Sequence, residues 1–133
     1  MPINNDESIP NDAILLRLLT KDWIVTKEGV RRPTSHAFRE SNFESSCFVD
    51  SPATRIELKK LYPGFEIAAI PAQVFRESGF AIERRPDEVP EGFEGDRRNH
   101  VVVGPPQACA RNLHERMARS IVRNVRVAIL VLE

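Results

Sequence analysis

The chain has 133 residues, of which 41% are apolar and 29% are charged, a composition typical of one globular domain. Acidic and basic residues are equal in number, 19 of each, which excludes a general electrostatic attraction to nucleic acid or to a membrane. No apolar run reaches the ~18 residues of a membrane-spanning helix, and the acidic start is unlike a signal peptide. We therefore expect a cytoplasmic protein without a membrane partner.

The charges are distributed unevenly along the chain. Of the basic residues, 15 are arginine, and residues 105–126 hold five of them against a single acid, Glu115. Residues 86–96 hold five acids and no base. Because a guanidinium group binds phosphate or carboxylate with two parallel hydrogen bonds, the arginine bias favours anion recognition. A GC-rich coding sequence would produce the same bias without any function.

The first ten residues are polar and end at Pro10. They predict a disordered tail over residues 1–10, followed by a single globular domain over residues 11–133. The domain starts with a capping residue and with apolar side chains at helical spacing, which predicts a helix over residues 13–19.

The rest of the chain alternates between short apolar runs and helical patterns, with glycine and proline between them. We expect strands over residues 23–25, 45–49, 65–70, 80–83 and 100–103, and helices over residues 35–39, 52–61 (capped by Ser51), 72–77 and 107–122. The apolar residues 125–132 are typical of a final strand or of an interface. This order predicts an α+β fold, with a small mixed β-sheet and three to four helices packed on it.

Helical spacing also predicts which side chains are buried. In the predicted helix that ends at Leu61 we expect Ile56 and residues 58–61 to face inward. In the last helix the predicted inner stripe is Ala110, Leu113, Met117 and Ile121. The outer flank of that helix carries Arg111, Glu115, Arg119 and Arg123 at intervals of four residues. Residues 86–99 form a long acidic loop, and loops of this length are usually mobile or functional.

The first candidate site is a polar run that follows a turn. It contains Arg31, Arg32, Thr34, Ser35 and His36, and Pro33 lies within it. Guanidinium groups and hydroxyls near the start of a helical turn suit a phosphate or a carboxylate, because free backbone N–H groups there favour negative charge. The alternative is a solvated loop in which Thr34 or Ser35 caps the turn.

A second candidate is His100, which opens an apolar strand that ends in Gly104. This histidine is suited to general acid–base chemistry, or to a structural hydrogen bond at the edge of a sheet. If the two clusters converge, the binding residues are Arg31, Arg32, Thr34, Ser35, His36, Ser46 and His100. No residue is predicted to be catalytic, because no nucleophile motif is present.

No metal or cofactor is expected. His36, His100 and His114 share no ligand spacing, and Cys47 and Cys109 lie far apart. In a reducing compartment the two cysteines are predicted to be small buried hydrophobic residues.

The arginines of the last helix suggest contact with a phosphate backbone, but we expect nucleic acid not to be a partner. No aromatic residues alternate with these arginines, so bases would find no stacking surface. One further option is that the acidic residues 86–96 pack on the arginine face and neutralise it.

Several segments together are similar to a group of small uncharacterised bacterial proteins. They are Trp23, the run from Arg32 to Phe38, a serine-bearing strand near Ser46, Gly64-Phe65 with Ala68-Ala69-Ile70, and His100-x-Val102-x-Gly104. The resemblance covers about residues 15–120 and implies no reaction, because no activity is assigned to the group. It does imply that the two polar clusters belong to one recurring design. The chain departs from the group's pattern at Glu66, and in the last helix, where arginines replace lysines.

Three functions remain open from the sequence. The first is a binding module for an anionic group, such as a nucleotide, a phosphate or a partner's carboxylates. The second is a small hydrolase or transferase on a phosphorylated or nucleotide substrate, with His36 or His100 as acid or base. The third is a protein-interaction or immunity-type partner, or a homo-oligomer, that uses residues 125–133 and the loop 86–99.

Overall fold

The computed structural model describes residues 3–40, 42–123 and 130–132. A six-stranded sheet has the order β6-β7-β4-β1-β5-β8, and β2 and β3 form a separate hairpin. The sheet strands are β1 (Ile14–Leu19), β4 (Ser45–Val49), β5 (Glu66–Pro71), β6 (Ala81–Arg84), β7 (His100–Gly104) and β8 (Leu130–Leu132). The hairpin strands are β2 (Ile24–Lys27) and β3 (Val30–Pro33), and the α-helices are α1 (Pro52–Leu61), α2 (Ala72–Glu77) and α3 (Arg111–Val122). Four 3-10 turns complete the chain: η1 (Lys21–Trp23), η2 (Ser35–Phe38), η3 (Pro86–Glu88) and η4 (Arg97–Asn99).

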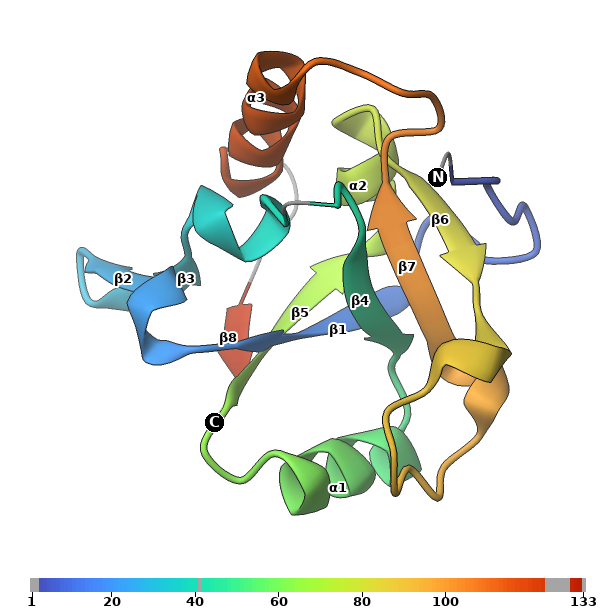
Figure 1. The fold of residues 1–133 in the computed structure, drawn as a ribbon. Coiled ribbons are helices and arrows are strands. Elements are labelled where there is room, and N and C mark those ends of the chain that lie inside the picture. The colour runs from blue at the N-terminus through green and yellow to red at the C-terminus, as the bar shows by residue number, and fades with distance from the viewer. Residues whose placement is uncertain (1–2, 41, 124–129, 133) are drawn as a thin grey trace.

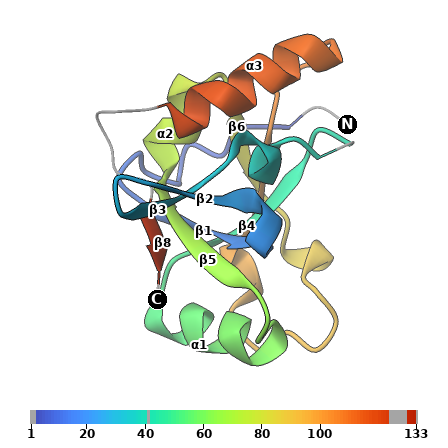
Figure 2. The same ribbon diagram turned by 90° about the vertical axis from the view of Figure 1, so that its left-hand side faces the viewer.

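The predicted α+β class is confirmed, but the prediction of a mixed sheet is wrong. All pairs of neighbouring strands in the described sheet are antiparallel. Helices α2 and α3 cover one face of this sheet and α1 covers the other (Figures 1 and 2). The core is therefore in two parts, one that includes Phe75 of α2 and Ile121 of α3, and one that includes Leu58 of α1.

The predicted helix over residues 13–19 is wrong, because these residues form the central strand β1. β1 pairs with β4 on one side and with β5 on the other. Leu15 belongs to the core part under α2 and α3, whereas Leu16 belongs to the part under α1. A strand buried on both faces is a continuous apolar run, which a helical pattern matches equally well.

Helices α1 and α2 have the predicted bounds. The side chain of Ser51 caps α1, since its Oγ accepts a hydrogen bond from the Thr54 N–H at 3.1 Å. The predicted inner face of α1 is wrong at Ile56, which is 69% exposed.

Helix α3 starts at Arg111, four residues later than predicted, and its inner stripe is shifted by one residue. Its buried side chains are His114, Ala118 and Ile121, whereas Leu113 is 40% exposed. The His114 ring stacks on Phe80 with ring centroids 5.6 Å apart. With the helix in this orientation about its axis, His114 faces the core and Leu113 faces outward.

The predicted disordered tail is wrong for residues 3–10. Ile3 and Ile9 are each only 1% exposed. The Asp6 N–H donates to the Ile82 carbonyl of β6 at 2.7 Å, and the Ile82 N–H donates to Asn5 Oδ1 at 3.2 Å. Residues 3–11, which we call the N-terminal strap, thus satisfy backbone groups at the outer edge of β6.

The long acidic loop 86–99 lies on the α1 side of the sheet. The Phe93 ring packs on Phe48 of β4 with centroids 5.3 Å apart, and the Glu94 N–H donates to Glu57 Oε1 of α1 at 3.1 Å. Asn99 also donates to Thr54 Oγ1 at 3.3 Å. These contacts hold the loop against α1.

The apolar end of the chain forms a strand where it is described. Leu130–Leu132 is β8, which pairs with residues 67–69 of β5. Residues 125–129 and 133 of the predicted strand or interface lie outside the described residues. Among the helices in the described ranges, none has the length and apolar character that crossing a membrane requires.

Candidate functional site

The two arginines of the first predicted cluster lie on opposite faces of the hairpin. Arg31 faces Thr26 across the hairpin and Arg32 faces Val25, and neighbouring residues of a strand point to opposite sides. The Arg31 side chain forms an ion pair with Glu66 of β5. Arg31 therefore connects the hairpin to the sheet and does not share a site with Arg32.

The three other residues of this cluster lie in and before η2. Thr34 is the residue at the cap position, but its side chain makes no cap hydrogen bond. Its Oγ1 atom is buried without a hydrogen-bond partner, while its N–H donates to the Trp23 carbonyl at 2.7 Å. Ser35 is half-buried and His36 is exposed.

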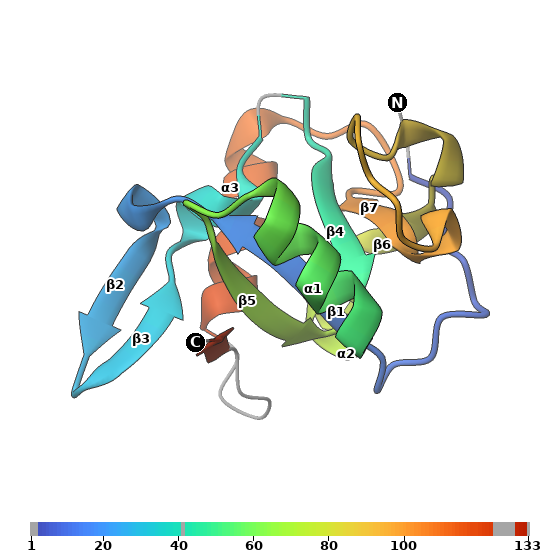
Figure 3. The ribbon, with the colours of Figure 1, turned by 90° about the horizontal axis from the view of Figure 1, so that it is seen from below.

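His100 lies on the other side of the molecule from this cluster. The hairpin and strand β7 are at opposite sides of the structure (Figures 1 and 3). The His100 side chain is buried, with Nδ1 2.7 Å from the Arg85 carbonyl and the ring against Phe48. Because a carbonyl only accepts, Nδ1 carries the hydrogen, and the histidine fastens the start of β7 to Arg85.

Ser46 is exposed in β4, and its backbone carbonyl accepts a hydrogen bond from Arg17 Nη1 at 3.0 Å. Ser46 pairs with Val102 in the neighbouring strand, not with His100. The structure therefore does not bring the seven predicted binding residues together.

Arg17 is a buried polar residue that the sequence reasoning missed. Its Nε donates to the Ala37 carbonyl at 2.9 Å and its Nη2 donates to Glu40 Oε1 at 2.6 Å. Together with the bond to Ser46, these contacts fix η2 against β1 and β4. The signal in the sequence was an arginine inside the apolar run of residues 14–19, where a helix predicted an exposed side chain.

The segment after η2 brings a basic surface together with α3. Arg39, which ends η2, forms an ion pair with Glu115 of α3, with Nη2 and Oε1 2.9 Å apart. The hydrogen bond from Arg39 is the main cause that holds the pKa of Glu115 below its usual range. The nearby charges of Arg119 and Arg111 lower this pKa further. Three guanidinium groups thus act on one carboxylate, and that of Arg39 is in direct contact with it.

Two more arginines of α3 lie beside this group. With about 100° of rotation per residue, Arg111, Arg116, Arg119 and Arg123 fall within an arc of about 140° around the helix. We call these four residues and Arg39 the basic surface. Arg116 and Arg123 are exposed, and they form no ion pair with any residue in the described ranges.

The acidic loop does not cover the basic surface, so the option that it neutralises these arginines is wrong. Glu94 lies 3.6 Å from Lys60 of α1, and Asp96 pairs with Arg98 of its own loop at 2.9 Å. Helices α1 and α3 are on opposite faces of the sheet (Figure 2). The arginines of α3 therefore keep their charge at the surface.

A buried histidine lies beneath the basic surface. The His114 ring is held between Phe80 and Phe43, and its Nδ1 has no hydrogen-bond partner. Burial is the main cause that lowers the pKa of His114, and the positive charges of Arg111 and Arg39 lower it further. The Arg111 guanidinium lies over the Phe43 ring, 5.3 Å from its centroid.

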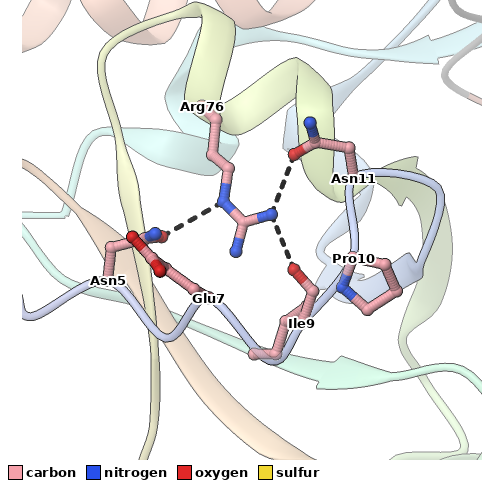
Figure 4. Close-up of a pocket in the computed structure, with 6 residues that line it drawn as sticks. All are labelled: Asn5, Glu7, Ile9, Pro10, Asn11 and Arg76. Atoms are coloured by element: carbon pink, nitrogen blue, oxygen red, sulfur yellow. Dashed lines mark hydrogen bonds between the residues drawn. The ribbon is translucent and has the colours of Figure 1, made fainter.

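One open hollow, of about 370 Å³, lies beside the N-terminal strap (Figure 4). Its arginine, Arg76, donates through Nε to Asn5 Oδ1, through Nη1 to the Ile9 carbonyl and Asn11 Oδ1, and through Nη2 to the Asp6 carbonyl, all within 3.1 Å. The charge of Arg76 therefore holds the strap and is largely enclosed by its acceptors.

A second open hollow, of about 380 Å³, is lined by Arg84, Asp96, Arg98 and Asn99. Its arginines are also paired. Arg84 Nε lies 3.2 Å from Asp6 Oδ2, and Arg98 binds Asp96 through two nitrogens. Neither hollow has an exposed arginine without an ion pair to a described residue, as Arg116 and Arg123 are on the basic surface.

Cysteine and metal chemistry have little support in the described ranges. Cys47 is buried as predicted, and burial raises the pKa of its thiol to about 12, whereas Cys109 is half-buried. No group of three or more histidine, cysteine, aspartate or glutamate side chains in these ranges is placed to hold a metal ion.

Searches of protein families, of curated proteins and of solved structures find no match to this chain. The resemblance to a group of bacterial proteins stays a prediction, and the functional argument rests on the geometry of the chain itself.

Proposed function

We propose that the protein is a binding module for an anionic group and that the basic surface is its binding site. The observation that carries the proposal is the set of three arginines, Arg39, Arg111 and Arg119, around the single carboxylate of Glu115. In this set three positive charges act on one acid, in a chain whose net charge is zero. Guanidinium groups are the side chains best suited to hold phosphate or carboxylate oxygens.

The packing supports the same site. Glu115 and Arg39 are 29% and 24% exposed, so their ion pair is shielded from water and keeps the two elements in a fixed relation. Because η2 is also fastened by Arg17, Arg39 is held beside Glu115 before any ligand arrives. A site that is ordered in advance loses less entropy when it binds.

The alternative of a hydrolase or transferase has weaker support. It needs His36 or His100 beside the arginines that steady the negative charge. His100 is only 2% exposed and donates to a backbone carbonyl on the far side of the sheet. His36 is exposed in η2, and its link to the basic surface is through the backbone, where its carbonyl accepts from the Arg39 N–H at 3.4 Å.

The test is the thermal stability of the protein with inorganic triphosphate and with a nucleoside triphosphate. A ligand present at ~100 times its dissociation constant adds about 2.7 kcal/mol of stability. For a domain of this size the melting temperature then rises on the order of 10 °C. We expect the rise to be reduced in Arg119→Gln and unchanged in Arg97→Gln, which removes one exposed charge from η4 on the α1 side.

A third variant separates this site from the hairpin. If Arg32→Ala abolishes the rise while Arg119→Gln keeps it, the anion binds at the hairpin and the proposed surface is wrong. If no anion changes the melting temperature of the wild type, the proposed function itself is wrong.

A further inference from the structure

The basic surface is longer than a single anion. Arg111 and Arg123 are the first and last of its arginines along α3, and at ~1.5 Å per residue they are about 18 Å apart along the helix axis. Arg116 and Arg119 lie between them. A hydrogen bond to phosphate spans only about 3 Å, so one phosphate reaches one or two of these groups. The full surface therefore suits an anion that repeats its charge along a line.

Part of the charge on this line, that of Arg116 and Arg123, forms no ion pair within the described part of the protein. Glu115 is already held by Arg39 from η2. Arg116 and Arg123 are exposed and have no ion pair with a described residue. The acidic loop that would neutralise them is held on the opposite face of the sheet by α1. The positive charge of this surface is therefore complementary to that of an external polyanion.

The chemistry of the surface distinguishes two kinds of polyanion. A partner protein with acidic residues would bury an apolar centre, as protein interfaces do. The outward residues of α3 are Asn112, Arg116, Ser120 and Arg123, and Leu113 is the one large apolar side chain of the helix that is exposed. A phosphodiester backbone needs only positive charge, because its binding is driven by the release of counterions.

We infer that the basic surface binds the phosphodiester backbone of a nucleic acid, independently of its sequence. This inference rests on the proposed function and names the class of its ligand. Bases would find no stacking surface, because the Phe43 ring is covered by Arg111 and packed on His114. The contacts are therefore with phosphates, which position a protein on a duplex without reading its bases.

The inference differs from the expectation drawn from the sequence. That expectation rested on a net charge of zero, on the lack of aromatic residues on which bases could stack, and on the option that residues 86–96 cover the arginines. Net charge is an average over the molecule, and the structure separates the acidic loop from α3 (Figure 1). The local field at α3 is positive even though the total charge is zero.

The test is fluorescence anisotropy of the full chain with a labelled duplex of about 12 base pairs, as DNA and as RNA, between about 50 and 200 mM NaCl. Binding is expected to weaken linearly on a logarithmic plot, with a slope of about −3 to −4 if four arginines each neutralise one phosphate. Arg116→Gln and Arg123→Gln each reduce the size of this slope by about 0.9. The matched control, Arg97→Gln, leaves the slope and the affinity unchanged.

Two competitors separate this inference from the proposed function. If inorganic triphosphate binds and the duplex binds no more tightly than triphosphate, the site takes a single anion and the inference is wrong while the proposed function stands. If polyglutamate displaces the duplex at equal charge concentration, the ligand is an acidic protein segment and the inference is again wrong. If neither triphosphate nor duplex binds, both proposals fail.

Discussion

His114 shows how one residue of α3 joins the core to the basic surface. Its ring is 1% exposed and lies between two phenylalanine rings, while Nδ1 has no hydrogen-bond partner. Three charged groups act on it: Arg111 and Glu115 from its own helix and Arg39 from the end of η2. Burial and the two arginines disfavour the charged imidazolium, and Glu115 only partly offsets them. The folded protein therefore keeps this histidine neutral.

We predict that His114 makes the protein less stable in mild acid. Because the folded pKa is lowered below the usual 6.5, the unfolded chain binds the proton more readily. Stability is then full above about pH 6.5 and falls as the pH drops towards the folded pKa. Urea unfolding at about pH 7.5 and about pH 5 measures this loss. His114→Phe keeps the ring stack and should show a smaller loss than the wild type.

His36→Gln is the control, because this histidine is exposed and its removal should leave the acid sensitivity as it is. An equal loss of stability in His114→Phe and in the wild type would show that other groups cause it.

At the scale of elements, the N-terminal strap protects the edge of the sheet. Strand β6 pairs with β7 on one side only, and an open edge invites pairing with another chain. The strap fills that edge through Asp6 and Asn5, which bind both backbone groups of Ile82. Arg76 of α2 holds the strap in place through two of its carbonyls and two amide side chains (Figure 4).

Replacing Arg76 should therefore loosen the strap. In Arg76→Gln we expect faster hydrogen exchange at the amides of Asp6 and Ile82, and a loss of about 1–3 kcal/mol of stability from carbonyls left without a charged donor. The matched variant is Arg98→Gln, whose arginine is 81% exposed and pairs with Asp96 of its own loop, and we expect it to leave stability nearly unchanged. Unchanged exchange at Asp6 in Arg76→Gln would mean that the strap is held by its buried isoleucines alone.

At the scale of the whole molecule, the end of the chain closes the sheet on its other side. Strand β8 pairs with residues 67–69 of β5, and in that strand Ile67 and Ala68 are buried. The N-terminal strap and β8 thus cover the two opposite edges of one sheet. Leu130–Leu132 are thus part of the sheet, where the sequence alone left a strand and an interface as options.

A chain that ends at residue 129 should consequently be less stable and more prone to associate. Loss of β8 leaves the backbone groups of β5 unpaired at an edge. We expect the melting temperature to fall by about 5 °C or more, since 1 kcal/mol corresponds to roughly 3–6 °C in a domain of this size. Thermal melts with light scattering measure both effects, and a chain that lacks only Glu133 is the control. If the melting temperature is unchanged and only the oligomeric state changes, the end of the chain is an interface segment instead.

Sequence reasoning was accurate where the signals are local. The start of α1 follows from Ser51 and Pro52, which form the cap and the first helical position and depend only on neighbouring residues. It was wrong at residues 14–19, because an apolar run has no period that separates a buried strand from a helix. It was also wrong at residues 3–10, where two isoleucines in a polar segment are buried by distant parts of the fold, Ile3 with Ala81 of β6 and Ile9 in the core under α2 and α3.

For the candidate site, too, the sequence predicted the local features and the tertiary structure decided how they are combined. The sequence alone showed the excess of arginine in residues 105–126, the acidic loop and the polar run around Arg32, because composition and charge do not depend on folding. Only the tertiary structure decided which charges meet. In the structure Arg31 and Arg32 lie on opposite faces of a hairpin. The acidic loop packs against α1, and Arg39 forms an ion pair with Glu115 of α3. The reason is physical: a charge acts over a few ångströms, and distances between residues far apart in the chain are set by packing.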